Sequence, residues 1–299
     1  MKILLVALLP LVVATAGGSE VVAKVPVPGT PCGVAGSPGA VWVTDPLNGR
    51  LVRIDPATNT VTRQIPTDMT PCELRYAAGS LWVITQSGRL DRFDPSSGRR
   101  LASIRVGATT YDVAYAVRSI WITNRNGGTV QRISPVSNRV LKTVTFPVGV
   151  APAGIGWAAG ALWVGDDHGR SVFRLDPRTY RLTRVASGGQ AASWIATNGT
   201  DVWVSNTRSG SVSRIDAVRR KVVATVKVGV SPVNLDVIGG DVWVPDDLGN
   251  TITRIDGQTG RVVETIPTGK GPAVVAGAEG DVWATMFDDE QVWRIHPGS

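Results

Sequence analysis

The sequence predicts an all-β fold: a seven-bladed β-propeller whose blades are four-stranded antiparallel sheets. A tryptophan recurs about every 40 residues, an arginine follows each tryptophan, and short alternating apolar segments with turn residues fill each unit. The tryptophans are Trp42, Trp82, Trp121, Trp163, Trp203, Trp243 and Trp283, and the arginines that follow them are Arg53, Arg92, Arg132, Arg174, Arg214, Arg254 and Arg294. Because every unit repeats them at nearly the same spacing, we expect these residues to form the scaffold.

The first unit indicates how one blade is built. Its four strands are predicted at GVAGS (33–37), VWVTD (41–45), RLVRID (50–55) and TVTRQI (60–65). Glycine and asparagine at the junctions accept positive φ at little cost, which is typical of hairpin turns. Long helical periodicity is absent after residue 16, so the rest of the chain is predicted as strand and turn.

The two ends of the chain are predicted to share one blade. Only five residues follow Arg294, so the seventh unit lacks its fourth strand. Residues 21–31, VVAKVPVPGTP, align with residues 222–232 and 262–272, which are predicted fourth strands. We therefore expect the N-terminal strand to complete the last blade and to cover an otherwise open sheet edge.

The segment 1–16 is predicted to be a signal peptide. Lys2 precedes an apolar run at positions 3–13, and Ala14-Thr15-Ala16 matches the small-x-small pattern of a cleavage site. The run is shorter than the roughly 20 residues that span a bilayer, and no later stretch is apolar enough to do so. We expect one propeller domain at positions 17–299, exported to the periplasm, the medium or the cell surface, without a transmembrane segment after cleavage.

Cys32 and Cys72 each stand ten positions before a tryptophan, so they occupy equivalent places at the mouth of adjacent blades. In an exported protein this placement favours a disulfide, provided that the Cα atoms come within about 7 Å. A catalytic thiol is disfavoured, because no histidine is placed to activate either residue.

The repeat units read G-x-x-P-x-x-(V/I/L), x-(V/L)-W-V and R-I-D-P-x-T. Over residues 20–298 they resemble YVTN-type propeller repeats and the streptogramin B (virginiamycin B) lyase-like propellers. The resemblance implies the seven-bladed fold and, for the lyases, a magnesium ion, histidines and a glutamate at one mouth of the channel. This sequence departs from that pattern, because its only histidines, His168 and His296, fall on opposite faces of the repeat.

The channel of the propeller is predicted to hold the ligand site. The position eight places before each tryptophan is apolar in all seven units and should pack between blades, so its neighbours along the strand should face the channel. Most of these neighbours are small; the exceptions, our ligand-binding candidates, are Glu73, Arg75, Asp112, Trp194, Asn234 and Asp236. Such a set suits a small polar ligand or a cation. The alternative is that Arg75 pairs with Glu73 or Asp112 and the channel holds only water.

The loops between the second and third strands are acidic on the same face. They carry Asp45, Asp166, Asp167, Asp246, Asp247, Asp288, Asp289 and Glu290. We assign most of these acidic residues to turn capping, which does not account for Asp167 and Asp247. No spaced calcium loop appears, and we assign no metal ligands. The acidic side chains still leave a Mg²⁺ or Ca²⁺ site as an alternative.

The chain is basic, with a net charge of +7 that falls by one, to +6, when the signal peptide takes Lys2 away. Basic residues gather in the outer strands and in the turns before them: Arg99, Arg100, Arg139, Lys142, Arg178, Arg181, Arg184, Arg219, Arg220, Lys221 and Arg261. Such a rim could attract an anionic wall polymer, phospholipid heads or nucleic acid. Solvated outer strands explain the same composition.

These observations support three hypotheses. The first is an exported propeller that binds a ligand or protein through its top face and channel without catalysis. The second is a lyase-like enzyme that opens a cyclic depsipeptide with a divalent metal, with Glu73, Asp112, His168 and Asp236 as its candidate catalytic residues. The third is a salt-sensitive binder of nucleic acid or anionic wall polymer. No phosphate-binding glycine loop, zinc spacing or serine nucleophile motif is present.

Overall fold

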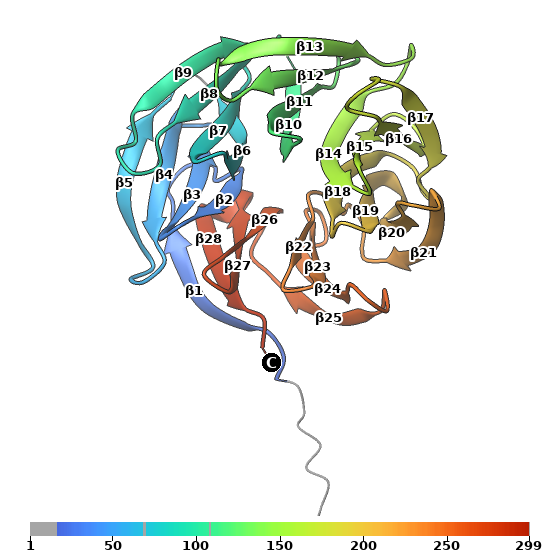
Figure 1. Ribbon diagram of the computed structural model, residues 1–299. Coiled ribbons are helices and arrows are strands. Elements are labelled where there is room, and N and C mark those ends of the chain that lie inside the picture. The colour runs from blue at the N-terminus through green and yellow to red at the C-terminus, as the bar shows by residue number, and fades with distance from the viewer. Residues whose placement is uncertain (1–16, 68–69, 108, 299) are drawn as a thin grey trace, which may run out of the picture.

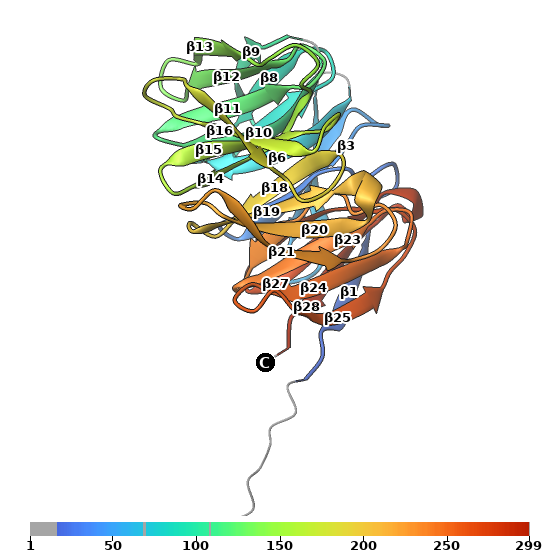
Figure 2. The same cartoon turned by 90° about the vertical axis from the view of Figure 1, so that its right-hand side faces the viewer.

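Seven four-stranded antiparallel sheets surround one central axis, so the predicted propeller is confirmed (Figure 1). The structure is a computed structural model, and it describes residues 17–67, 70–107 and 109–298. The predicted signal peptide, residues 1–16, lies outside the described residues. Figure 2, the side view, faces the two blades built from β14–β17 and β18–β21.

Each blade runs from an inner strand at the axis to an outer strand at the rim. The first four blades consist of β2 (Val34–Ser37), β3 (Ala40–Asp45), β4 (Arg50–Asp55) and β5 (Thr60–Pro66); β6 (Pro71–Ala77), β7 (Ser80–Thr85), β8 (Arg89–Phe93) and β9 (Arg100–Arg105); β10 (Thr110–Ala116), β11 (Ser119–Asn124), β12 (Thr129–Ser134) and β13 (Arg139–Thr145); and β14 (Pro152–Ala158), β15 (Ala161–Asp166), β16 (Ser171–Leu175) and β17 (Leu182–Ala186). The first blade matches the four strands predicted from its sequence.

The last three blades follow the same order, except that the seventh takes its outer strand from the N-terminus. They consist of β18 (Ala192–Thr197), β19 (Asp201–Asn206), β20 (Ser211–Asp216) and β21 (Lys221–Lys227); β22 (Asp236–Ile238), β23 (Asp241–Asp246), β24 (Thr251–Asp256) and β25 (Val262–Pro267); and β26 (Pro272–Ala278), β27 (Asp281–Met286), β28 (Gln291–His296) and β1 (Glu20–Pro26). Two 3₁₀ turns, η1 (Thr207–Ser209) and η2 (Phe287–Asp289), follow β19 and β27.

The ring closes as predicted, because β1 pairs antiparallel with β28. Val25 lies opposite Val292, and the amide of Val27 donates to the carbonyl of Glu290 over 2.8 Å. In both views the C-terminal end lies beside the start of β1 (Figures 1 and 2). Val25 and Val27 are 1% exposed and belong to the apolar cluster that joins the seventh blade to the first.

The core consists of seven apolar wedges, one between each pair of adjacent blades. Every wedge holds one repeated tryptophan and, from the next blade, the apolar residue that lies eight positions before the next tryptophan. The pairs are Trp42 with Leu74, Trp82 with Val113, Trp121 with Ile155, Trp163 with Ile195, Trp203 with Leu235, Trp243 with Val275, and Trp283 with Val34. All seven indoles are fully buried, so each blade depends on its two neighbours for its core.

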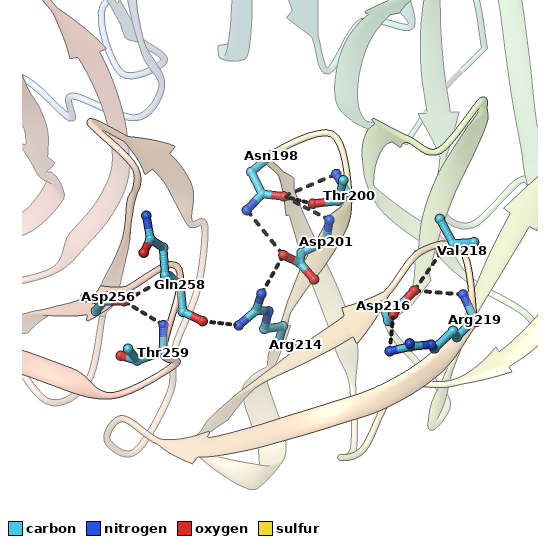
Figure 3. Close-up of polar contacts among 10 residues, drawn as sticks. All are labelled: Asn198, Thr200, Asp201, Arg214, Asp216, Val218, Arg219, Asp256, Gln258 and Thr259. Carbon is cyan, nitrogen blue, oxygen red and sulfur yellow. Dashed lines mark hydrogen bonds and ion pairs between the residues drawn. The ribbon is translucent and has the colours of Figure 1, made fainter.

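Five of the repeated arginines contact the next blade, on the opposite side from the acidic loops. Arg214 binds Asp201 of its own blade over 2.8 Å and donates to the carbonyl of Gln258, in the turn of the next blade, over 2.6 Å (Figure 3). The Asp256 carboxylate holds that turn by accepting from the amides of Gln258 and Thr259. The Arg214 guanidinium also lies 5.6 Å from the centre of the Trp203 ring, within the range of a cation–π contact.

The same link recurs around the ring. Arg92 donates to the carbonyl of Pro135 over 2.6 Å, and Arg294 donates to the carbonyl of Pro56 over 2.5 Å, which bridges the seventh blade to the first. The predicted scaffold role is therefore confirmed for the seven buried tryptophans and for the arginines that reach the next blade, which are Arg92, Arg132, Arg214, Arg254 and Arg294. Arg53 donates to Thr62 and Gly39 of its own blade.

Ring closure can be tested on two valines of the same strand. Val25→Asp places an unpaired charge in the wedge between the seventh and first blades, and we expect the free energy of unfolding to fall by at least about 3 kcal/mol. Val22→Asp is the matched control, because Val22 is 43% exposed on β1, and it should change that free energy by less than about 0.5 kcal/mol. Urea denaturation measures both. Equal effects of the two variants would contradict the role of β1 in closing the ring.

Candidate functional site

Two cavities follow each other along the axis of the propeller and share Glu73 and Val274. The upper cavity, on the side of the acidic loops, has a volume of about 520 Å³, and the lower cavity, toward the opposite face, has a volume of about 290 Å³. Upper and lower are used in this sense below. Glu73 thus stands at the boundary between the two cavities.

The six candidate ligand-binding residues all line these cavities. Glu73, Arg75, Asp112, Asn234 and Asp236 line the lower cavity, and Trp194 lines the upper cavity together with Glu73. They come from the inner strands and strand entries of the second, third, fifth and sixth blades. The structure therefore brings residues from distant parts of the sequence to one channel.

Gly33 and Gly154 stand nine positions before their tryptophans, beside the apolar position of the repeat, and were therefore expected to face the channel, but each lies against a neighbouring blade. A Cβ atom on Gly33 would lie 2.3 Å from the carbonyl oxygen of Cys72, and one on Gly154 would lie 2.6 Å from the amide nitrogen of Ile195. Glycine at these two positions therefore permits the close approach of the next blade.

Arg75 contacts the next blade through its side chain. Its Nε donates to the carbonyl of Val113 over 2.8 Å. No carboxylate in the described part of the chain comes within 4.0 Å of this guanidinium, so the expected alternative, a close ion pair with Glu73 or Asp112, is absent there. Arg75 instead acts on the carboxyl groups of Glu73, Asp112 and Asp236 through longer-range electrostatic attraction across the channel.

Asp112 and Asp236 are held by backbone amides. Asp112 accepts from the amide of Val113 over 2.7 Å and from the amide of Ile155, on the next blade, over 2.8 Å. Asp236 accepts from the amide of Val237 over 2.8 Å through one oxygen. Burial raises the pKa of Asp112 to about 6 although Arg75 opposes the shift, and burial also raises the pKa of Asp236.

Glu73 differs from both aspartates, because no described residue forms a hydrogen bond with its carboxyl group. The residue is only 7% exposed. Burial and, after it, the charge of Asp112 raise the pKa of Glu73 to about 8, with Arg75 acting in the opposite direction. At neutral pH the Glu73 carboxyl therefore keeps its proton and can both donate and accept a hydrogen bond in the channel.

An aromatic pair forms one wall of the upper cavity. The rings of Trp194 and Tyr111 have centroids 4.7 Å apart and planes inclined by 34°. The Arg125 guanidinium lies 5.3 Å from the Tyr111 ring and forms an ion pair with Asp167, which also accepts from the hydroxyl of Ser193 over 2.5 Å. Asp167, which turn capping did not explain, thus fixes Arg125 and neutralises its charge.

Sequence reasoning missed Tyr111 and Arg125, although the repeat contains the signal. Tyr111 stands ten positions before its tryptophan, the same place as Cys32 and Cys72, and Arg125 stands four positions after it, the same place as Asp247. All five residues line the upper cavity. Reading these two positions across the seven units would have identified them.

The rim of the upper cavity carries one acidic residue without a hydrogen-bond partner for its side chain among the described residues, Asp247. Burial and the nearby charges of Asp288 and Asp246 raise the pKa of Asp247. The capping prediction is confirmed for other acidic residues: Asp45 accepts from the amide of Asn48, Asp166 from that of His168, and Asp246 from that of Gly249.

Cys32 and Cys72 are joined by a disulfide in the structure, with their Cα atoms 5.3 Å apart. The bond links the first two blades, and both residues line the upper cavity. The wall of this cavity therefore includes a covalent link between neighbouring blades.

The two histidines lie away from the channel. His168, in the turn after β15, lines a separate cavity of about 480 Å³ between loops and outer strands of the fourth blade, which shares no lining residue with the channel cavities. His296 contacts Asp281 over 2.7 Å at the opposite end of the seventh blade. Of the four candidate catalytic residues, the structure brings Glu73, Asp112 and Asp236 together and places His168 elsewhere.

No cluster of three or more histidine, cysteine, aspartate or glutamate side chains in residues 17–67, 70–107 and 109–298 is arranged to hold a metal ion. The same residues include no helix with the length and apolar character needed to cross a membrane.

A family model described as a repeat of unknown function (DUF6923) matches residues 75–234, which is more than half of the chain. The chain belongs to this repeat family. A search of curated proteins finds none that matches this sequence.

Solved structures with the same fold include two lyases and one other enzyme. A streptogramin B lyase matches with a TM-score of 0.82 and 15% identity over 93% of this chain and 97% of its own. The virginiamycin B lyase from Staphylococcus aureus matches with a TM-score of 0.81 and 17% identity over 93% and 99%. The hydrazine synthase of Kuenenia stuttgartiensis matches with a TM-score of 0.78 and 14% identity over 96% and 99%. At these identities the likeness establishes the fold.

The raised pKa of Glu73 predicts a pH-dependent stability. The folded protein keeps this proton up to about pH 8, whereas the unfolded chain releases it near pH 4.5. Between these values the unfolded state binds fewer protons, so the contribution of Glu73 to the free energy of unfolding falls as pH rises, by at most about 1.4 kcal/mol per pH unit.

Glu73→Gln removes this contribution. We therefore expect the stability of the variant relative to the natural protein to increase as pH rises from about 5 to about 8, measured by urea denaturation at each pH. Glu290→Gln, on an exposed glutamate of the top face, is the matched control and should follow the natural protein. Parallel curves for Glu73→Gln and the natural protein would show that Glu73 titrates as an ordinary carboxyl.

Proposed function

We propose that this protein is an exported, non-catalytic propeller that binds a small organic cation in its upper cavity. The observation that carries the proposal is Glu73, a buried carboxyl without a hydrogen-bond partner among the described residues, at the floor of that cavity. When it is ionised, this carboxylate faces the cavity with no described donor to neutralise it, so a cation in the cavity gains its attraction. The ligand thus supplies the interaction that the folded chain leaves unmade.

The chemistry of the upper cavity supports a cation with an apolar body. Trp194 and Tyr111 offer aromatic faces, which attract cations as well as apolar groups. Asp247 at the rim and Glu73 at the floor supply negative charge when they are ionised, while the charge of Arg125 is already neutralised by Asp167. A ligand carboxylate or phosphate would be repelled by the first two groups.

The proposal of export rests on the segment 1–16 together with the disulfide. The first strand begins at Glu20, so cleavage after Ala16 keeps the whole of β1 and the closed ring. A disulfide between Cys32 and Cys72 suits an oxidising compartment. Mass spectrometry of the protein from its native host tests this, because a mature chain that begins at Gly17 is expected, and an intact leader would contradict export.

Cation binding is tested with benzyltrimethylammonium, which has an aromatic ring and a permanent positive charge. We expect binding by isothermal titration calorimetry that strengthens as pH rises from about 6 to about 9, because Glu73 must release its proton to face the cation. Trp194→Ala and, at the upper end of this pH range, Glu73→Gln should each weaken binding about tenfold.

Two controls separate specific binding from general attraction. Glu290→Gln removes an exposed acidic charge from the same face and should leave the affinity unchanged. Benzyl alcohol, which is neutral, should bind more weakly than the cation at every pH. Equal affinity of Glu73→Gln and the natural protein for benzyltrimethylammonium at high pH would overturn the proposed site.

The absence of catalysis is a separate prediction. The streptogramin B lyases share the fold, but here the only top-face histidine, His168, lies outside the channel. Incubation of the protein with a streptogramin B antibiotic and Mg²⁺ should leave the cyclic depsipeptide intact, as followed by mass spectrometry. A linear product that forms with the natural protein and disappears on removal of the metal would replace the proposal with the lyase alternative.

A further inference from the structure

The lower cavity has an aromatic mouth that the repeat does not require. Tyr76, Tyr115 and Trp157 stand six positions before their tryptophans in three consecutive blades, and all three line this cavity. The other four blades carry Gly36, Thr197, Val237 and Gly277 at the same position. Since glycine serves there in two blades, the scaffold does not need an aromatic ring at this point.

This mouth opens on the face opposite the acidic loops. Tyr115 is the penultimate residue of β10 and precedes the turn into β11, and its side chain is 42% exposed. Tyr76 and Trp157 are half-buried, and each packs partly against an apolar wedge between two blades. The wedges hold these two rings in place, so the aromatic mouth is formed without a ligand.

Above the rings, the cavity wall carries hydrogen-bonding groups of both kinds without partners. The terminal nitrogens of Arg75, the side-chain amide of Asn234 and the second carboxylate oxygen of Asp236 make no hydrogen bond within the described residues. Glu73, more than nine-tenths buried, adds an unpartnered carboxyl at the upper end. Donors and acceptors are therefore both open to a ligand in one small space.

We propose that the lower cavity binds a single neutral sugar ring, such as the terminal residue of a glycan, entering from the face opposite the acidic loops. A sugar ring has an apolar C–H face that packs on aromatic rings and hydroxyl groups that both donate and accept. The cavity volume of about 290 Å³ lies near the lower end for small-ligand sites, which suits one ring.

The charges of the cavity favour a neutral ligand over an ionic one. A phosphate or carboxylate that approached Arg75 would also meet Asp236 and Asp112, and an ammonium group that approached Asp236 would meet Arg75. Hydroxyl groups satisfy donors and acceptors without this conflict. This site shares Glu73 with the proposed cation site but differs from it in its cavity, its face and its ligand.

The test uses the methyl glycosides of glucose, galactose, mannose and N-acetylglucosamine, with the mature protein, by saturation-transfer NMR and calorimetry. At least one glycoside should bind with a millimolar or lower dissociation constant, with the strongest saturation on its ring C–H protons. Tyr115→Ala and Trp157→Ala should each weaken binding about tenfold. Phe287→Ala, which removes a partly buried aromatic ring from outside both channel cavities, is the matched control and should leave the affinity unchanged.

Three outcomes would overturn the proposal: no glycoside binds, Tyr115→Ala binds as well as the natural protein, or glycine or phenylalanine binds where glycosides do not. Trp157 packs against a core wedge and its variant could lose the fold, but Tyr115 belongs to no wedge, so its variant keeps the test decisive. Circular dichroism verifies the fold of each variant. Benzyltrimethylammonium binding is measured separately, so failure of one site is distinguished from failure of the other.

Discussion

The fold depends on the burial of one indole between each pair of blades. Each repeated tryptophan is fully buried in its wedge, and its partner is an apolar residue from the inner strand of the next blade. Because no blade encloses a core of its own, a blade is stable only beside its neighbours, and the ring must close for every wedge to be complete. The arginine links on one face add polar contacts between the same pairs of blades.

This constraint explains where the chain is free to vary. Positions that fill the wedges hold the same kind of residue in all seven units, whereas positions along the channel differ from blade to blade. At the same channel positions, some blades therefore carry polar or aromatic side chains and others carry glycine or alanine. The seven units thus build a regular scaffold and an uneven lining of the two cavities.

The sequence was sufficient for the fold and for part of the site. A repeat of fixed length determines the number of blades, and the alignment of residues 21–31 with later fourth strands predicted the pairing of β1 with β28. The same alignment placed Glu73, Arg75 and Asp236 at the channel. It could not predict that Arg75 reaches the Val113 carbonyl or that Asp167 holds Arg125, because these contacts join different blades and depend on side-chain conformation.

The pairing of β1 with β28 also bears on how the molecule is made. More than 260 residues separate β1 from its partner β28 along the chain, so β1 has no native partner strand until β28 has been synthesised. The six other sheets consist of consecutive strands and can assemble in order. Closure of the ring thus joins two segments across a long loop, and a chain that lacks β28 would leave the edge of β27 open to other chains.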